Sequence, residues 1–541
     1  MTFPGLMMQQ PLTLRLCLER AETLFPDRGA TTKTPGGMVR TTYGQIGERC
    51  RRLANALTTL GIEPGDRVGS FAWNSTRHLE LYLGVPCMGA VLHTLNIRLH
   101  PEQVAWIANH AEDKIVFVDE SLLPVFAQVA PHLTTVKHIV VMADGPLPPA
   151  APDGALSYED LLAAASPSYA WPDLDENAAC AMAYTSGTTG NPKGVVYSHR
   201  AMTLHAFMSC MVDSNGIGEA DVCLPIVPMF HANAWGIPWA AALAGANIVF
   251  PAQYMTPPDI LSLIESERVT FTAGVPTIWI GALPEVQKGT CDLSSLQRVV
   301  IGGAAVPLSL IKAYDDLGIR ILQGWGMTET GPLASLSRPL STMDATMSRE
   351  ELQTVRAKQG LPVAGVELRI MGEDGVAPWD GKTFGEVQVR GNWVARTYYN
   401  DERSPESWTE DGWLRTGDVA IVDATGFVQL VDRTKDLVKS GGEWISSVDL
   451  ENAIMGHPKV AEAAVIAIPD EKWSERPMAC VVPKPGETLT SDELIAHLSG
   501  ILPKWWLPET IAFIDEVPKT SVGKFDKKVL RARYADGTLA P

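Results

Sequence analysis

The sequence predicts an α/β fold in two domains: a large N-terminal domain of layered, mostly parallel sheets with helices, and a smaller α+β domain. At 541 residues the chain is too long for one ordinary hydrophobic core. Strand-like and helix-like segments alternate through residues 1–431, which is typical of parallel sheets covered by helices. From Asp432 onward the pattern changes to a compact α+β arrangement. We therefore predict domains at 1–431 and 432–541, with the boundary at Asp432.

The first well-defined helix is predicted to begin after Thr42. Thr42 and Gln45 have the spacing of a capping box, in which two side chains satisfy backbone groups at a helix start. Apolar residues from Ile46 to Leu60 then recur on one helical face. In the small domain, Thr490 and Glu493 have the same spacing and predict a second capped helix.

Short runs rich in β-branched residues are predicted as buried strands, because they are too short for helices. In the large domain these runs are residues 67–72, 114–119, 137–142 and 299–303. Residues 361–431 contain short runs of Gly, Val, Arg and Thr, which indicate a small antiparallel, β-barrel-like unit. In the small domain the predicted strands are residues 463–468, 478–482 and 511–515.

The composition is that of a folded, acidic protein. Hydrophobic residues make up 46 % and charged residues 20 %, and the net charge is −18. Such a charge disfavours non-specific binding to nucleic acid or to anionic membranes. The eight cysteines occur singly, without the spacing of a zinc site, which indicates reduced, buried thiols. Because the sequence opens without a signal-peptide pattern and contains no membrane-length apolar run, we expect a soluble cytoplasmic protein.

The sharpest local motif is Tyr184-Thr-Ser-Gly-Thr-Thr-Gly-Asn-Pro-Lys-Gly-Val195. Small and hydroxyl-bearing residues let the backbone approach a polyphosphate, and successive N–H groups can form an anion-binding nest. Lys193 adds a point charge. The motif is not a Walker A loop, because Gly194 follows the lysine where Ser or Thr is required. It predicts a phosphate-binding loop rather than an ordinary turn.

Five further motifs follow in the chain. They are Gly324-Trp-Gly-Met-Thr-Glu-Thr330, Arg415-Thr-Gly-Asp418, Asp432-Arg-Thr-Lys-Asp436, Ser440-Gly-Gly-Glu-Trp444 and Pro518-Lys-Thr-Ser-Val-Gly-Lys524. With residues 184–195 they resemble, in order, the motifs of the adenylate-forming superfamily of acyl-CoA synthetases, firefly luciferases and peptide-synthetase adenylation domains. The resemblance is closest to acyl-CoA synthetases that act on medium- and long-chain fatty acids or on 3-methylmercaptopropionate. It implies a ligase that uses ATP to convert a carboxylic acid into its acyl-AMP and then into a coenzyme A thioester.

The resemblance also implies where ATP and Mg²⁺ bind. Thr185 and Glu329 would share Mg²⁺, a hard cation that prefers oxygen ligands. Trp325, where the family more often has Tyr, would stack on adenine, and the two oxygens of Asp418 suit the ribose hydroxyls. The residues that the resemblance assigns to ATP or coenzyme A are Thr185, Ser186, Gly187, Thr188, Thr189, Gly190, Lys193, Gly302, Gly303, Ala304, Gly324, Trp325, Gly326, Thr328, Asp418, Arg433, Lys435, Lys439, Gly441, Gly442, Glu443, Trp444, Glu475 and Lys524.

Lys524 and the loop 440–444 are expected to serve different half-reactions. In the family, the matching lysine bridges the acyl carboxylate and the α-phosphate, and the matching loop lines the pantetheine tunnel of coenzyme A. Because both steps take place at one site, a hinge at Asp432 would exchange Lys524 for the Gly441-Gly442 loop. The expected catalytic residues are Lys524, Glu329, Thr185 and His231.

Residues 227–236 resemble the acyl-binding side of the family, although a core histidine and a core tryptophan would be the simpler interpretation without the resemblance. The predicted substrate residues are His231, Trp235, Gly303, Gly331 and Pro332. The whole-chain resemblance and the bulky Trp235 imply a short- or medium-chain acid, with 3-methylmercaptopropionate ahead of a medium- or long-chain fatty acid. A thioether makes much the same apolar contacts as a short alkyl chain. Since related enzymes are homodimers, a homodimer is also expected.

Three alternatives compete with this interpretation. A nicotinamide enzyme would need a third glycine in the motif that starts at Gly324, and Glu329 stands in its place. A non-catalytic nucleotide sensor would be free to lose Lys193, Glu329, Asp418 and Lys524, and all four are present. An adenylating enzyme with another acceptor is disfavoured by the loop 440–444, which resembles that of enzymes using coenzyme A.

Overall fold

The computed structural model of the chain describes residues 3, 5–185, 191–433, 436–440, 443–521 and 523–539, except for the side chains of Glu443 and Trp444. These residues form two compact units. Unit 1 comprises Met1–Phe271, Thr328–Pro332 and Asn392–Ser404, and unit 2 comprises Thr272–Met327, Leu333–Gly391 and Pro405–Pro541. Asp432 lies inside unit 2, and the domain boundary with a hinge at this residue stays a prediction.

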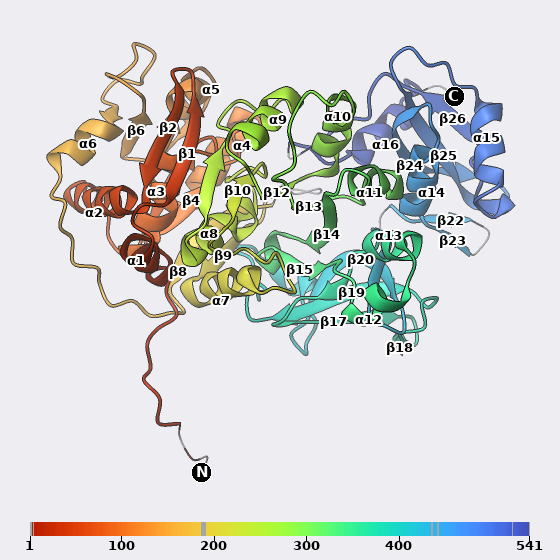
Figure 1. Ribbon diagram of the computed structural model, residues 1–541, viewed down its shortest axis with the longest axis horizontal. Coiled ribbons are helices and arrows are strands. Elements are labelled where there is room, and N and C mark those ends of the chain that lie inside the picture. Colours follow the sequence, from red (N-terminus) through yellow and green to blue (C-terminus); the bar gives the residue numbers. More distant parts are fainter. Residues whose placement is uncertain are drawn as a thin grey trace. The chain divides into compact units, whose positions relative to one another are not determined.

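Unit 1 contains a seven-stranded sheet in which all neighbouring strands are parallel except the last pair (Figure 1). In sheet order the strands are β7 (Leu156–Ser157), β6 (His138–Met142), β5 (Asp113–Asp119), β3 (Arg67–Phe71), β4 (Val91–Thr94), β8 (Ala179–Tyr184) and β9 (Gly194–Ser198). The antiparallel hairpin β8–β9 carries the predicted phosphate loop at the carboxyl end of β8. Ligands of α/β proteins gather at such strand ends.

A second strand group in unit 1 joins parallel and antiparallel pairs. Strands β10 (Val222–Pro225), β11 (Asn247–Phe250) and β1 (Gly29–Thr34) are parallel, and β1 forms a hairpin with β2 (Gly37–Thr42). The helices of unit 1 are α1 (Arg15–Leu24), α2 (Tyr43–Thr59), α3 (Thr76–Cys87), α4 (Pro101–His110), α5 (Leu123–Val129), α6 (Tyr158–Ala164), α7 (His199–Cys210), α8 (Ile237–Ala244) and α9 (Pro257–Ser266).

Unit 2 begins with short parallel strands and continues into an antiparallel sheet. After β12 (Phe271–Gly274), which spans the change of unit, β13 (Arg298–Gly302) and β14 (Arg320–Gly326) are parallel, and β15 (Leu333–Leu336) and β16 (Leu361–Pro362) follow antiparallel. The segment predicted as antiparallel holds a five-stranded sheet in the order β18 (Gly375–Val376), β17 (Val366–Gly372), β19 (Gly385–Gly391), β20 (Leu414–Val422) and β21 (Val428–Arg433). The helices here are α10 (Pro276–Gln287), α11 (Leu308–Asp315), α12 (Ser341–Thr346) and α13 (Arg349–Arg356).

The C-terminal part of unit 2 is the predicted α+β arrangement (Figure 1). Its sheet contains β23 (Glu443–Ile445), β22 (Val438–Ser440), β25 (Ser474–Pro483) and β24 (Val460–Asp470), and β26 (Thr510–Phe513) is parallel to β25. Helices α14 (Ser447–Met455), α15 (Ser491–Ser499) and α16 (Lys527–Ala535) accompany this sheet. Apolar residues of α14, α15, β24 and β25 form one buried cluster, so this part of the chain has a core of its own.

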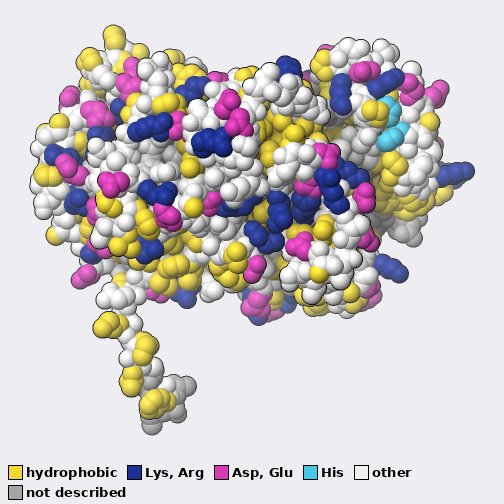
Figure 2. All heavy atoms as spheres, in the orientation of Figure 1, with side chains coloured by type: hydrophobic (Ala, Val, Ile, Leu, Met, Phe, Trp, Pro, Cys, Tyr) yellow, Lys and Arg dark blue, Asp and Glu magenta, His cyan; other side chains and the backbone are white. Residues whose placement is uncertain are grey.

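The predicted α/β fold class is confirmed, and so are the local elements on which it rested. Both capping boxes form, at Thr42 for α2 and at Thr490 for α15. Each of the seven predicted strands overlaps an observed strand, with ends that differ by a few residues. Within the described residues, no helix combines the length and apolarity needed to cross a membrane. On the face seen in Figure 2, acidic and basic side chains are interspersed.

An ion cluster around one buried carboxylate joins three helices of unit 1. The Arg49 guanidinium on α2 contacts Glu80 on α3 at 2.6 Å and Glu159 on α6 at 2.9 Å. Tyr158 donates a second hydrogen bond of 2.6 Å to Glu80, whose side chain is 1 % exposed. Burial raises the pKa of Glu80, and Arg49 opposes that rise. Arg49 therefore compensates a carboxylate that has no access to water.

Replacement of Arg49 should destabilise unit 1 far more than loss of a surface ion pair. Arg49→Met leaves Glu80 buried with only a neutral donor, and we expect the free energy of unfolding to fall by about 3 kcal/mol. Arg15→Met is the matched control, because it removes an exposed pair with Glu19 on α1 and should cost roughly 0.5 kcal/mol. Urea unfolding measures both variants, and equal midpoints would contradict the assignment.

Candidate active site

The predicted phosphate loop begins and ends in an ordered hairpin. The backbone N–H of Thr185 donates to the carbonyl of Lys193 at 2.9 Å, which extends the β8–β9 ladder by one pair. The Lys193 N–H lies 3.4 Å from the Thr185 hydroxyl oxygen, to which it donates. Residues 186–190, which include Ser186, Gly187, Thr188, Thr189 and Gly190, lie outside the described residues. Thr185 and Lys193 thus lie opposite each other, where the chain enters and leaves the loop.

Glu329 is held beside this hairpin by a tyrosine that the sequence analysis did not single out. It lies in the short helix η4 (Thr328–Thr330) and is 5 % exposed. The Tyr398 hydroxyl donates to Glu329 Oε1 at 2.7 Å, and the Lys193 ammonium lies 4.5 Å from the centre of the Tyr398 ring. The Ala395 N–H also donates to the Glu329 carbonyl at 2.7 Å. Tyr398 therefore contacts two of the predicted phosphate-side residues of unit 1, Glu329 and Lys193.

Arg403 contacts the backbone on the C-terminal side of the loop. Arg403 pairs with Asp401 and donates to the carbonyl of Asn191 at 3.2 Å. The hydrogen bond from Arg403 lowers the pKa of Asp401 to about 2, with a smaller contribution from Lys193. Asp401 therefore stays ionised and partly neutralises the positive charge next to the loop.

The oxygen atoms of Glu329 and Thr185 suit Mg²⁺. Tyr398 binds one carboxylate oxygen of Glu329, which leaves the other to a cation. Within the described residues, no group of three or more His, Cys, Asp or Glu side chains could hold a metal by itself. One carboxylate and one hydroxyl match a cation that takes its remaining ligands from phosphate oxygens and water.

In unit 2, the predicted adenine and ribose residues are joined by hydrogen bonds. The register of β13 and β14 places Gly302 opposite Gly324. Trp325 is 6 % exposed, and its indole N–H donates to Asp418 Oδ2 at 2.8 Å. The guanidinium of Arg433 lies 3.3 Å from the other oxygen of Asp418. The structure therefore brings Trp325, Asp418 and Arg433 together from strands β14, β20 and β21.

The Lys524 side chain lies against the glycine turn after β13. A Cβ placed on Gly303 would come within 2.9 Å of Lys524 Cε, and the φ of Gly303 is +86°. Only a glycine suits this position, because a side chain would meet both backbone strain and the lysine. The Thr520 N–H donates to the Lys524 carbonyl at 2.7 Å and closes the loop that carries the lysine.

Only some of the residues predicted to bind coenzyme A are among those that the structure describes. Lys435, Gly441 and Gly442 lie outside the described residues, and for Glu443 and Trp444 the backbone alone is described, in β23. Glu475 accepts a 2.8 Å hydrogen bond from the backbone of Lys439, so these two candidates are neighbours.

The segment that carries His231 and Trp235 ends at Gly236, which packs against a buried histidine. His231 precedes the short helix η3 (Ala232–Gly236), in which Trp235 has a φ of +56°. A Cβ on Gly236 would lie 2.6 Å from His205, whose pKa burial lowers to about 3. His205 packs edge-on against Trp393 with ring centres 5.7 Å apart.

The Trp393 ring also lies against Gly331, which precedes Pro332, and leaves little room there for a side chain. A Cβ on Gly331 would lie 3.0 Å from the Trp393 ring. Trp393, which sequence reasoning missed, therefore packs directly beside the predicted substrate residue Gly331. His205, also missed, packs against Trp393 and Gly236. Gly303, the remaining predicted substrate residue, belongs to unit 2.

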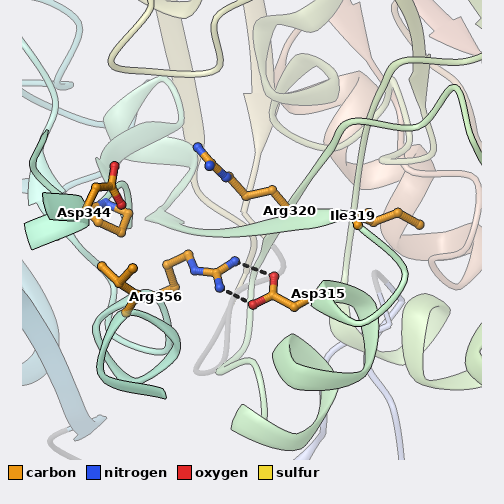
Figure 3. A pocket seen from close by; sticks show the side chains of 8 residues that line it. Asp315, Ile319, Arg320, Asp344 and Arg356 are labelled. Atoms are coloured by element: carbon orange, nitrogen blue, oxygen red, sulfur yellow. Dashed lines mark hydrogen bonds and ion pairs between the residues drawn. The ribbon is translucent and has the colours of Figure 1, made fainter. Parts of the chain in front are cut away.

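A cavity of about 250 Å³ in unit 2 is a different feature (Figure 3). Asp315 of α11 and Arg356 of α13 form a paired hydrogen bond across it, and Arg320 extends into it. Arg320 is the first residue of β14, whereas Gly324, Trp325 and Gly326 end that strand. The cavity thus lies at the opposite end of β14 from the predicted adenine site, and its charged pair braces two helices.

Two family models match the chain. Residues 18–399 match the family described as "AMP-binding enzyme", and residues 449–524 match "AMP-binding enzyme C-terminal domain". The chain is 48 % identical to a long-chain-fatty-acid–CoA ligase of Thermus thermophilus, over 98 % of this chain and 97 % of that protein. It is 44 % identical to a 3-methylmercaptopropionyl-CoA ligase of Ruegeria pomeroyi (98 % and 99 % covered) and 41 % identical to a medium-chain-fatty-acid–CoA ligase of Ectopseudomonas oleovorans (98 % and 98 %).

Solved structures agree with these matches. The anthranilate CoA ligase AuaEII in complex with anthranoyl-AMP superposes with a TM-score of 0.87 at 27 % identity, covering 98 % of this chain and 99 % of that one. ATP-bound MatB from Rhodopseudomonas palustris superposes with a TM-score of 0.81 at 28 % identity, covering 97 % and 99 %. The chain belongs to the AMP-binding, adenylate-forming enzyme family. Within that family it is an AMP-forming acid–CoA ligase.

Removal of the Tyr398 hydroxyl should weaken adenylate formation. Tyr398→Phe keeps the ring under Lys193 but deletes the donor to Glu329, and a hydrogen bond to a charged group is worth about 1.5–3 kcal/mol. We expect kcat/KM for ATP to fall roughly 10-fold or more, by the tenfold-per-1.4 kcal/mol relation. The rate of ATP–pyrophosphate exchange measures this change in kcat/KM. Tyr399→Phe, at the next position, is the control and should stay near wild type.

Proposed function

We propose that this ligase activates a short- or medium-chain carboxylic acid with an apolar chain, and that 3-methylmercaptopropionate is its first candidate substrate. The supporting observation is the buried aromatic group of Trp393 and His205 beside Gly331 and Gly236, which offers apolar surface and a neutral histidine. A thioether chain and a short alkyl chain both suit such surroundings. The 44 % identity to a 3-methylmercaptopropionyl-CoA ligase supports the same choice.

A long- or medium-chain fatty acid is the second candidate. Its support is the 48 % identity to a long-chain-fatty-acid–CoA ligase and the 41 % identity to a medium-chain enzyme. The two candidates differ in the length of the chain and share the carboxylate chemistry. The proposed partners are accordingly the acid, ATP and coenzyme A, and we expect the protein to act as a homodimer.

In the proposed first half-reaction, a carboxylate oxygen attacks the α-phosphorus of ATP and pyrophosphate leaves. The protein supplies position and charge rather than a nucleophile. Trp325 and Asp418 would hold the nucleoside, and Lys193 would contact the departing phosphates. Lys524, which lies beside Gly303, would stabilise the charge that develops between the carboxylate and the α-phosphate. Mg²⁺, when bound by Glu329 and Thr185, neutralises phosphate charge.

In the proposed second half-reaction, the thiol of coenzyme A displaces AMP from the acyl carbon. The loop 440–444 would line the approach of the thiol, with Lys439 and Glu475 beside it. Rotation at Asp432 would exchange Lys524 for this loop, so that one site serves two steps. His231 and Trp235 would border the acyl group in both steps.

An acid panel identifies the substrate. AMP release is measured with ATP, Mg²⁺, coenzyme A and each of acetate, butyrate, 3-methylmercaptopropionate, octanoate and palmitate. We expect the highest kcat/KM with 3-methylmercaptopropionate, because the apolar group around Trp393 favours an uncharged chain of modest size. A higher value with octanoate or palmitate would replace the first candidate by the second, and no AMP release with any acid would contradict both.

Replacement of Lys524 should separate the half-reactions. Lys524→Ala removes the charge proposed to act at the α-phosphate, and loss of one such group costs about 10²–10³ in rate. Lys519→Ala is the control, because Lys519 lies in the same loop but pairs with Glu462. We expect acyl-AMP formation to fall in the first variant alone, while thioester formation from supplied acyl-AMP changes little in either. A wild-type rate of adenylation in Lys524→Ala would refute the assigned role.

A further inference from the structure

The loop that carries Lys524 is followed directly by a largely buried lysine, Lys527. Lys527, the first residue of α16, has a side chain that is 12 % exposed. Its ammonium lies 2.8 Å from Glu451 Oε1 on α14 and also donates to the hydroxyl of Ser447, which begins that helix. Glu451 is 10 % exposed at its side chain and accepts a further 2.7 Å hydrogen bond from the backbone of Val465.

The same cluster reaches the predicted hinge residue. The Ser447 hydroxyl donates to Asp432 Oδ2, and Asp432 is 6 % exposed near the end of β21. Burial alone would lower the pKa of Lys527, but Glu451 and Asp432 outweigh it and raise that pKa. A continuous set of contacts therefore runs from Asp432 through Ser447 to Lys527, three positions after Lys524 in the chain.

A second contact one turn along α16 runs parallel to the first. Arg531 lies four positions after Lys527, on the same helical face, and its guanidinium pairs with Asp436. Two basic residues of α16 thus meet the segment around the predicted hinge, Lys527 through Ser447 on the Asp432 side and Arg531 at Asp436.

The Lys524 loop itself is short and closed. The Asp526 N–H donates to the Pro518 carbonyl at 2.7 Å, and the Thr520 N–H donates to the Lys524 carbonyl at 2.7 Å. Asp526 also caps α16 by accepting from the Lys528 N–H. Because the loop is closed at its base and continues directly into α16, a shift of that helix start would displace Lys524.

Stability alone does not account for this cluster. A buried ion pair costs desolvation that the attraction between its charges barely repays, and apolar residues of the same volume are often as stable. A buried cation with defined partners does, however, specify one position for the element that carries it.

We propose that Lys527 is a positioning residue that couples the Lys524 loop to the predicted hinge at Asp432, so that the position of Lys524 is fixed relative to that hinge. This role rests on the proposed function of Lys524 and Asp432. Lys527 acts through Lys524 in the adenylation step and has no part in the attack by the thiol.

The test compares Lys527→Met, the double variant Lys527→Met with Glu451→Gln, and Lys528→Met. Lys527→Met leaves Glu451 buried without its cation and should lower the unfolding midpoint. The double variant removes that unpaired charge, so its unfolding midpoint should return most of the way to the wild-type value. Lys528 is the neighbouring, exposed lysine and serves as the matched control.

Each half-reaction is then followed separately. In both Lys527 variants we expect kcat of pyrophosphate exchange to fall roughly 10–100-fold, since small displacements of a catalytic group cost up to 10²-fold. The KM values for ATP and acid and the rate of thioester formation from supplied acyl-AMP should change less than about threefold, because Lys527 touches neither ligand in this scheme.

Three results would overturn the proposal. The first is a folded double variant that adenylates at the wild-type rate, which would make Lys527 a stabilising residue only. The second is a parallel fall of both half-reactions with the folded fraction, and the third is a double variant that does not recover its midpoint. Failure of the proposed function is read separately, on the wild-type enzyme, as the absence of adenylate with every acid of the panel, and it would remove this proposal too.

Discussion

The register between β13 and β14 is the constraint that positions Trp325, which is predicted to contact the nucleotide. It aligns Gly302 with Gly324, so that the glycine turn after one strand and the tryptophan of the other stand at the same sheet edge. From there Trp325 reaches Asp418 on β20, and Asp418 reaches Arg433 on β21. Because side chains alternate between the faces of a strand, a shift by one residue would turn Trp325 to the opposite face and break its contact with Asp418.

A protein with a net charge of −18 needs local positive groups if it is to bind a polyphosphate, as the proposed function requires. The candidate groups here are single cations held by local contacts. Lys193 lies over the ring of Tyr398, and Arg403 is neutralised by Asp401 while it binds the loop backbone. In the proposed function, such placement would attract a phosphate group at one point of an otherwise acidic protein.

Ion pairs with at least one buried partner recur where separate helices meet. Arg49 and Glu80 join α2 to α3, and the paired hydrogen bond of Asp315 and Arg356 joins α11 to α13. Lys527 joins the start of α16 to α14 and β21 through Glu451 and Ser447. A charged side chain that is shielded from water is stable only beside a partner of opposite charge or a hydrogen-bond donor or acceptor. These pairs therefore define how the helices pack, even where they add little stability.

The sequence by itself determined the fold class, the local elements and the motifs of the site. Capping boxes at Thr42 and Thr490 and short β-branched runs are local patterns, and neighbouring residues decide them. The tertiary structure alone decided the contacts of Tyr398 with Glu329, 69 positions away, and of Trp325 with Asp418, 93 positions away. No periodicity encodes such pairs, because they follow from chain segments that topology brings together. For the same reason Tyr398, Trp393, His205 and Lys527, which stand outside the local motifs or beside them, were recognised only once the chain was folded.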